Sequence, residues 1–150
     1  MKKTILIALA ILMALLATGY APDTDPGAMK AKYASSTSQL IELDPGFHVH
    51  VRDEGVRGGR TLVLIHGGGS SLHTWEPWVR ILGGKHRVIT FDLPGHGLTG
   101  PNPAGKYTQQ DFVDFSFRLL TKLGVERAVI GGNSMGGGVA WLMAVQQPAR

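Results

Sequence analysis

From residue 39 onward, short apolar runs alternate with glycine-rich or polar loops. Two of these runs, 40–43 and 47–51, flank Asp44-Pro45-Gly46, a combination typical of a β-hairpin. Continuous apolar runs predict buried strands over 61–65, 87–91 and 128–131, and helical spacing of apolar residues predicts helices over 75–82, 107–123 and 139–147. Strand and helix therefore alternate, which predicts an α/β fold with a mostly parallel sheet, right-handed crossovers and flanking helices.

The N-terminal segment 1–21 has a different pattern. Lys2 and Lys3 precede an uncharged stretch, 4–21, that is rich in Ile, Leu, Met and Ala. This order is typical of a secretory signal, and Ala17-Thr18-Gly19 offers small residues to a signal peptidase. As a helix the stretch would reach about 27 Å, so attachment to a membrane through an uncleaved anchor is the alternative. Both interpretations export the rest of the chain, to the periplasm, the medium or the outer side of a membrane.

Composition narrows the classes of function. Residues 22–38 are polar and are interpreted as a linker, which leaves 39–150 for the folded domain. The net charge is +4 with scattered basic residues, so no nucleic-acid partner is expected. The absence of cysteine excludes a disulfide framework, a thiol nucleophile and a zinc-thiolate site. His48 and His50 lack a third ligand nearby, so we expect two solvent-facing strand histidines and no metal site.

The sequence 132–136, Gly-Asn-Ser-Met-Gly, fits the pattern G-x-S-x-G between a predicted strand and a predicted helix. In that context Ser134 occupies a sharp, strained turn, which lifts its hydroxyl clear of the backbone at a helix N-terminus. Side chains at Gly132 and Gly136 would collide across the turn. The nucleotide-binding patterns G-x-G-x-x-G and G-x-x-x-x-G-K-[ST] match neither glycine cluster nor the Gly-Lys pairs.

Several motifs together resemble the α/β-hydrolase superfamily. They are Leu-Ile-His-Gly-Gly-Gly at 64–69, Phe-Asp-Leu-Pro-Gly-His-Gly-Leu-Thr-Gly at 91–100 and Gly-Gly-Asn-Ser-Met-Gly-Gly-Gly at 131–138. The resemblance implies that Ser134 is a nucleophile acting on a small-molecule acyl substrate, such as an ester, without a cofactor. It also implies an oxyanion hole formed by the backbone N–H groups of Met135 and Gly68.

The remaining loop residues receive structural roles in this interpretation. His66 is expected to bond the backbone of its own loop, and Asp92 is expected to cap N–H groups of the neighbouring turn, as the family's aspartate does. His96 receives no chemical role.

The resemblance covers the first half of such a domain. All six histidines and every acidic residue precede Ser134, whereas the family's triad acid and histidine follow the nucleophile. We therefore expect a serine hydrolase seen as its N-terminal half, which has little activity by itself. The alternative is a non-catalytic remnant or interaction module that retains half of the fold. A base supplied from elsewhere, for example by His66, is a third hypothesis without support from spacing.

Overall fold

The computed structural model describes residues 2–19 and 23–149. Its elements in chain order are α1 (Lys2–Gly19), α2 (Pro26–Tyr33), β1 (Ser38–Asp44), β2 (Phe47–Gly55), β3 (Thr61–Ile65), the 3-10 helix η1 (Leu72–Trp75), α3 (Glu76–Leu82), β4 (Arg87–Phe91), α4 (Gln109–Lys122), β5 (Val129–Gly132) and α5 (Met135–Gln146). The predicted alternation of strand and helix is confirmed.

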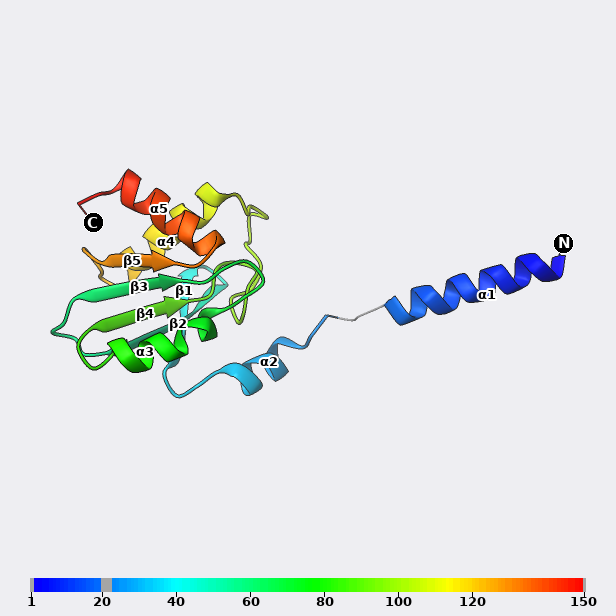
Figure 1. The fold of residues 1–150 in the computed structure, drawn as a ribbon, viewed down its shortest axis with the longest axis horizontal. Coiled ribbons are helices and arrows are strands. Elements are labelled where there is room, and N and C mark those ends of the chain that lie inside the picture. Colours follow the sequence, from blue (N-terminus) through cyan, green and yellow to red (C-terminus); the bar gives the residue numbers. More distant parts are fainter. Residues whose placement is uncertain (1, 20–22, 150) are drawn as a thin grey trace.

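The five strands form one sheet in the order β1-β2-β4-β3-β5 (Figure 1). β1 and β2 are the predicted hairpin, and β2 pairs antiparallel with β4. β4, β3 and β5 run parallel, with Ile65 opposite Phe91 on one side and opposite Gly132 on the other. The three carboxyl ends therefore lie together at one edge of the sheet, as predicted for a mostly parallel α/β fold.

Helices cover both faces of the sheet. α4 and α5 lie on one face and contact each other, whereas η1 and α3 lie on the opposite face (Figure 1). The core between α4, α5 and the sheet contains fully buried Val63, Ile65 and Ile89 together with Leu119 of α4 and Val139 of α5. α4 begins at a capping box in which Thr108 accepts a hydrogen bond from the N–H of Asp111 and the Asp111 side chain accepts one from the N–H of Thr108.

Two helices, α1 and α2, precede the first strand. Every side chain of α1 for which a position is described is exposed. No helix among the described residues is long and apolar enough to cross a membrane. The predicted boundary between the apolar segment and the linker, at residues 21 and 22, lies outside the described residues. α2 falls inside the predicted linker 22–38, where no helix was expected, and buries no residue completely.

Two other expectations need correction. His50 is not solvent-facing: it is fully buried, because η1 and the loop after β4 cover its face of β2, whereas His48 is exposed as predicted. The last helix starts at Met135 rather than at residue 139, directly after Ser134.

Candidate active site

Loops at the carboxyl ends of β3, β4 and β5 build the candidate site. The loop after β5 is tied to the end of β3 by a hydrogen bond from the N–H of Asn133 to the carbonyl of Ile65, 3.1 Å long. Since β3 is the central one of the three parallel strands, its loop has the loops of β4 and β5 on its two sides. This arrangement brings the candidate oxyanion loop, Gly67 and Gly68, to the sharp turn 132–136 that carries Ser134, here called the elbow.

Ser134 has a strained backbone. Its φ of 49° and ψ of −116° make it the one non-glycine residue with positive φ among the described residues. A side chain in this region costs of order 1–3 kcal/mol, and such residues concentrate at functional sites. The residue is exposed, occupies the N-cap of α5 and makes no side-chain capping bond. The predicted strained turn with an exposed hydroxyl is thus present.

Close backbone contacts explain the glycines on either side of Ser134. A Cβ at Gly132 would lie 2.2 Å from the carbonyl oxygen of Gly136, across the turn. A Cβ at Gly136 would lie 2.3 Å from the carbonyl oxygen of Ile65 and 2.4 Å from that of His66. Real Cβ atoms do not approach backbone this closely, so α5 can rest against the end of β3 only where glycine is present.

The candidate oxyanion loop lies beside the elbow. A Cβ built on Gly67 would be 3.4 Å from the Cβ of Ser134, and one built on Gly68 would be 3.9 Å from the Sδ of Met135. Met135 is the first residue of α5, so its N–H has no acceptor within the helix. No hydrogen bond within the described part of the chain uses the N–H of Gly68. Both predicted donors are therefore free and close to the serine.

His66 is committed to the backbone. Its side chain is fully buried, Nδ1–H donates to the carbonyl of Gly67 at 2.8 Å, and Nε2 accepts from the N–H of Leu93 at 3.0 Å. Burial lowers the pKa of His66 below its ordinary value, which favours this uncharged tautomer. Because both ring nitrogens are occupied, His66 cannot accept a proton from Ser134, and the structural role expected from the sequence is the correct one.

Asp92 holds three segments together. Its buried carboxylate accepts hydrogen bonds from the N–H groups of Leu72 and Leu98, at 2.7 and 2.8 Å, and from His50 Nδ1 at 2.8 Å. Burial acts to raise the pKa of Asp92, but the hydrogen bonds from His50 and the two N–H groups outweigh it, so the pKa lies below the usual range. The predicted cap on neighbouring N–H groups is confirmed, with His50 as a partner that local sequence did not indicate.

Ser38, His50 and Asp92 are hydrogen-bonded in the order of a catalytic triad, but the Ser38 hydroxyl is not available as a nucleophile. His50 Nε2 lies 2.7 Å from Ser38 Oγ. That oxygen also accepts from the N–H of Ser35 and from Arg52 Nε, at 3.0 and 3.3 Å. With both lone pairs occupied, the oxygen has none left for attack on a carbonyl carbon. We assign this network to the fold, where it fastens β1 and β2 to the loop after β4.

His96 and the remaining histidines make no hydrogen bond to Ser134 within the described residues. His96 Nδ1 lies 3.1 Å from the carbonyl of Pro94, and its ring lies 5.1 Å from that of His66, consistent with the absence of an assigned role. The described residues contain no group of three or more His, Cys, Asp or Glu that could hold a metal ion.

Strain at Ser134 leads to a stability prediction. Glycine adopts positive φ at little cost, whereas alanine keeps the Cβ that serine has. We expect Ser134→Gly to be more stable than Ser134→Ala by about 1 kcal/mol, even after glycine's greater chain entropy when unfolded. Thermal unfolding of both variants followed by circular dichroism measures the difference. Equal midpoints would show that the turn is not strained.

Comparisons with known proteins place the chain in a family. The model of the alpha/beta hydrolase fold family matches residues 60–150. The chain is 37% identical over 117 residues to the dihydrolipoyllysine-residue acetyltransferase component of the acetoin cleaving system of Cupriavidus necator, covering 78% of this chain and 30% of that protein. It is 32% identical to the 2-hydroxymuconate semialdehyde hydrolase of a Pseudomonas species over 108 residues, covering 70% and 38%.

A solved structure extends the similarity to the N-terminus. The crystal structure of a membrane phospholipase A, described as a bacterial virulence factor, superposes with a TM-score of 0.72 at 26% identity and covers 98% of this chain and 49% of its own. The chain thus spans between about a third and a half of the length of the proteins it matches. The family match, together with the strand order and the elbow, shows that the chain belongs to the alpha/beta hydrolase fold family.

Proposed function

We propose that Ser134 is the nucleophile of a serine hydrolase that acts on an ester-like or other acyl substrate. The observation that carries the proposal is the strained, exposed Ser134 facing the loop of Gly67 and Gly68. Similar proteins are, by their names, hydrolases and esterases, among them a pimeloyl-[acyl-carrier protein] methyl ester esterase of Legionella pneumophila. Serine in the elbow favours acyl transfer for this chain.

The chemistry follows from the arrangement of donors. Ser134 Oγ attacks the carbonyl carbon, its proton passes to a base, and the carbonyl oxygen becomes an oxyanion held by the N–H groups of Met135 and Gly68. Collapse of this intermediate expels the alcohol and leaves an acyl-serine, which water then hydrolyses. Each oxyanion donor contributes of order 3 kcal/mol to lowering the barrier in serine hydrolases.

A base for Ser134 is the missing component among the described residues. His66 and His50 are each bonded through both ring nitrogens. We therefore propose that residues 1–150 by themselves hydrolyse esters slowly, several orders of magnitude below an ordinary esterase. The alternative is a non-catalytic module, and acyl labelling of Ser134 distinguishes it from a serine hydrolase.

The proposal predicts where an activated acyl donor reacts. The full chain is incubated with p-nitrophenyl butyrate and 0.1 M imidazole, which stands in for a histidine base, and digested with trypsin. We expect a butyryl adduct on the peptide 128–150, whose one side-chain hydroxyl belongs to Ser134. The adduct should disappear in Ser134→Ala and persist in Ser70→Ala. Acylation that is spread over lysines, or that is unchanged in Ser134→Ala, would favour the non-catalytic module.

The N-terminal segment supports a second proposal, on localisation. We propose that residues 1–21 direct export of the domain, on the evidence of Lys2 and Lys3 followed by an apolar helix with exposed side chains. Deleting residues 1–21 should leave the protein in the cytoplasm, whereas the full chain fractionates with the periplasm or the membrane. Mass spectrometry of the exported product distinguishes a cleaved signal from a retained anchor. Cytoplasmic location of the full chain would contradict the proposal.

A further inference from the structure

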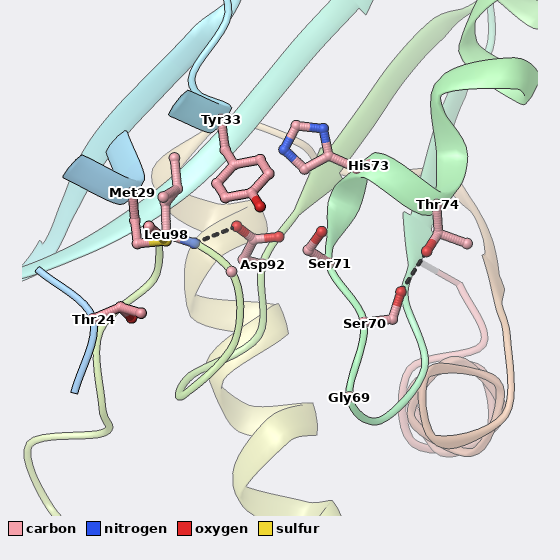
Figure 2. A pocket seen from close by; sticks show the side chains of 11 residues that line it. Thr24, Met29, Tyr33, Gly69, Ser70, Ser71, His73, Thr74, Asp92 and Leu98 are labelled. Atoms are coloured by element: carbon pink, nitrogen blue, oxygen red, sulfur yellow. Dashed lines mark hydrogen bonds between the residues drawn. The ribbon is translucent and has the colours of Figure 1, made fainter. Parts of the chain in front are cut away.

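A pocket of about 690 Å³ lies between α2 and two loops at the carboxyl edge of the sheet. Its walls come from Met29 and Tyr33 of α2, from residues 69–71 after β3, and from Asp92, Gly97 and Leu98 after β4 (Figure 2). α2 precedes the part of the chain that matches the family, which begins at residue 60. One wall of this pocket therefore comes from α2, outside the residues that the family model matches.

The pocket begins where the candidate oxyanion loop ends. Gly69 and Ser70, which line it, directly follow Gly68. A Cβ on Gly67 would lie 3.4 Å from the Cβ of Ser134, and each further residue adds at most about 3.8 Å between Cα atoms. The start of the pocket at Gly69 is thus at most about 7.6 Å, measured between Cα atoms, from Gly67, the glycine beside Ser134.

The walls suit an amphipathic group. Met29 and Leu98 form an apolar side next to each other (Figure 2). Five hydroxyl-bearing residues also line the pocket: Thr24, Tyr33, Ser70, Ser71 and Thr74. The hydroxyls of Ser70 and Thr74 bond each other (Figure 2). A hydroxyl both donates and accepts hydrogen bonds. Such a lining therefore suits alcohol groups, which also donate and accept, and carbonyl groups, which accept.

Charge selects against ionised ligands. The lining residues include no lysine or arginine, and the one carboxylate among them, Asp92, already accepts hydrogen bonds from Leu72, Leu98 and His50. A second anion would be repelled by Asp92 and would find no lysine or arginine in the lining. The one histidine there, His73, is already paired with Glu76 through Nδ1. A neutral ligand meets no such penalty.

α2 is fastened where it meets the pocket. Arg52, which is almost fully buried and paired with Glu76, donates from Nη2 to the carbonyl of Tyr33 at 3.4 Å. The ring of Tyr33 lies 6.0 Å from that of His73 in an edge-on arrangement. These contacts orient the Tyr33 side chain toward the pocket, as Figure 2 shows.

We propose that this pocket binds the uncharged alcohol part of the ester substrate, with Met29 and Tyr33 of α2 as residues that determine specificity. The assignment rests on the proposed function of Ser134, because it treats the bound group as the one that leaves when the acyl-serine forms. The ligand class is a small polyol or hydroxyl-bearing alcohol esterified to a short acyl chain.

A cysteine-protection experiment tests the proposal, since the chain contains no cysteine of its own. Met29→Cys places a thiol in the pocket, and Ala31→Cys places a matched thiol on the same helix at an exposed position that does not line it. Both are made in Ser134→Ala, so that the probe is not consumed. The probe is glycerol 1-monobutyrate, and the rate of alkylation by iodoacetamide is measured in the full chain.

We expect saturating probe to slow alkylation at least fivefold in Met29→Cys and to leave the alkylation rate of Ala31→Cys unchanged. Butyrate anion and choline at the same concentration should not protect. Adding Tyr33→Phe should raise the probe concentration for half protection about fivefold, the worth of one hydrogen bond. Circular dichroism confirms that each variant keeps the fold.

Three results would overturn the proposal. Absence of saturable protection in Met29→Cys would show that the pocket does not bind the ester. Equal protection in Ala31→Cys would show that the ester associates elsewhere. Protection by butyrate or choline as strong as by the ester would contradict the preference for an uncharged ligand. Protection is measured in proteins that lack Ser134, so it can be observed even if the labelling of Ser134 fails. That combination would refute the proposed function and the assignment of the ligand as a substrate. It would still show that the pocket binds the uncharged ester.

Discussion

Replacing Gly136 with alanine should lower the free energy of unfolding by about 4 kcal/mol or more. The added Cβ would lie 2.3 and 2.4 Å from the carbonyl oxygens of Ile65 and His66. Both oxygens belong to the backbone at the end of β3, the central strand of the parallel set, so neither can move without disturbing the sheet. Gly136→Val adds two methyl groups at the same place and should be worse. Urea unfolding followed by circular dichroism measures the loss.

Gly138→Ala is the matched control in the same helix. Its Cβ would also make a close contact, 2.2 Å, but with Nε2 of Gln109, the end of an exposed side chain that can rotate away. Alanine also gains up to about 1 kcal/mol of helix propensity over glycine, so the net change should be near zero. A loss as large as that of Gly136→Ala would mean that glycine content, rather than contact with β3, determines stability here.

The buried strands were the most predictable part of the fold. β3 and β4 occupy 61–65 and 87–91, the same bounds that the continuous apolar runs predicted. A strand that is covered on both faces needs apolar residues at nearly every position. It can therefore be recognised from its own residues, without knowing what packs against it. The placement of Ser134 on a turn between strand and helix was predictable for a similar reason. The turn leaves no room for side chains at positions 132 and 136, so both positions are glycine in the sequence.

The start of α5 was less predictable. Three consecutive glycines, 136–138, have low helix propensity, and this delayed the expected start to residue 139. In the fold, the contact of Gly136 with the end of β3 outweighs that propensity. Tertiary packing that requires glycine therefore makes a helix of residues that disfavour one when taken alone.

The burial of His50 and the helix α2 could not be predicted from the apolar pattern of the neighbouring sequence. Alternation along β2 places His50 on the face opposite Val49 and Val51. Its contacts on that face come from residues much later in the chain, Asp92 at 2.8 Å from Nδ1 and the ring of His73 at 6.4 Å. α2 buries no residue completely, so it leaves no apolar stripe. Asp25 as N-cap, followed by Pro26 in the first turn, was the signal that could have found it.

Asp92→Asn should be the most damaging polar substitution, costing about 3–5 kcal/mol near neutral pH. The carboxylate satisfies three donors: Leu72 N–H at Oδ1, and Leu98 N–H and His50 at Oδ2. An amide has one oxygen, so whichever way it is turned its NH₂ faces a buried donor, which leaves that donor unpaired. Asp114→Asn is the matched control, because Asp114 is exposed and receives only the side chain of Gln110. Its cost should stay within about 0.5 kcal/mol.

The pH dependence of the same pair of proteins gives a sharper test. Because the pKa of Asp92 in the folded protein lies below its ordinary value of 3.8, the unfolded chain binds the proton more tightly. The contribution of Asp92 is therefore complete above pH values near the ordinary pKa and is lost as the pH falls through the lower folded pKa. Stability differences between the original chain and Asp92→Asn, measured from pH 7 to pH 3, should be constant down to about pH 4.5 and then shrink. Asp53, Glu76 and Asp111 also have lowered pKa values, but they are common to both proteins and cancel in the difference. A difference that stays constant to pH 3, or that grows as the pH falls, would show that Asp92 does not act as a buried, ionised acceptor at the centre of this loop.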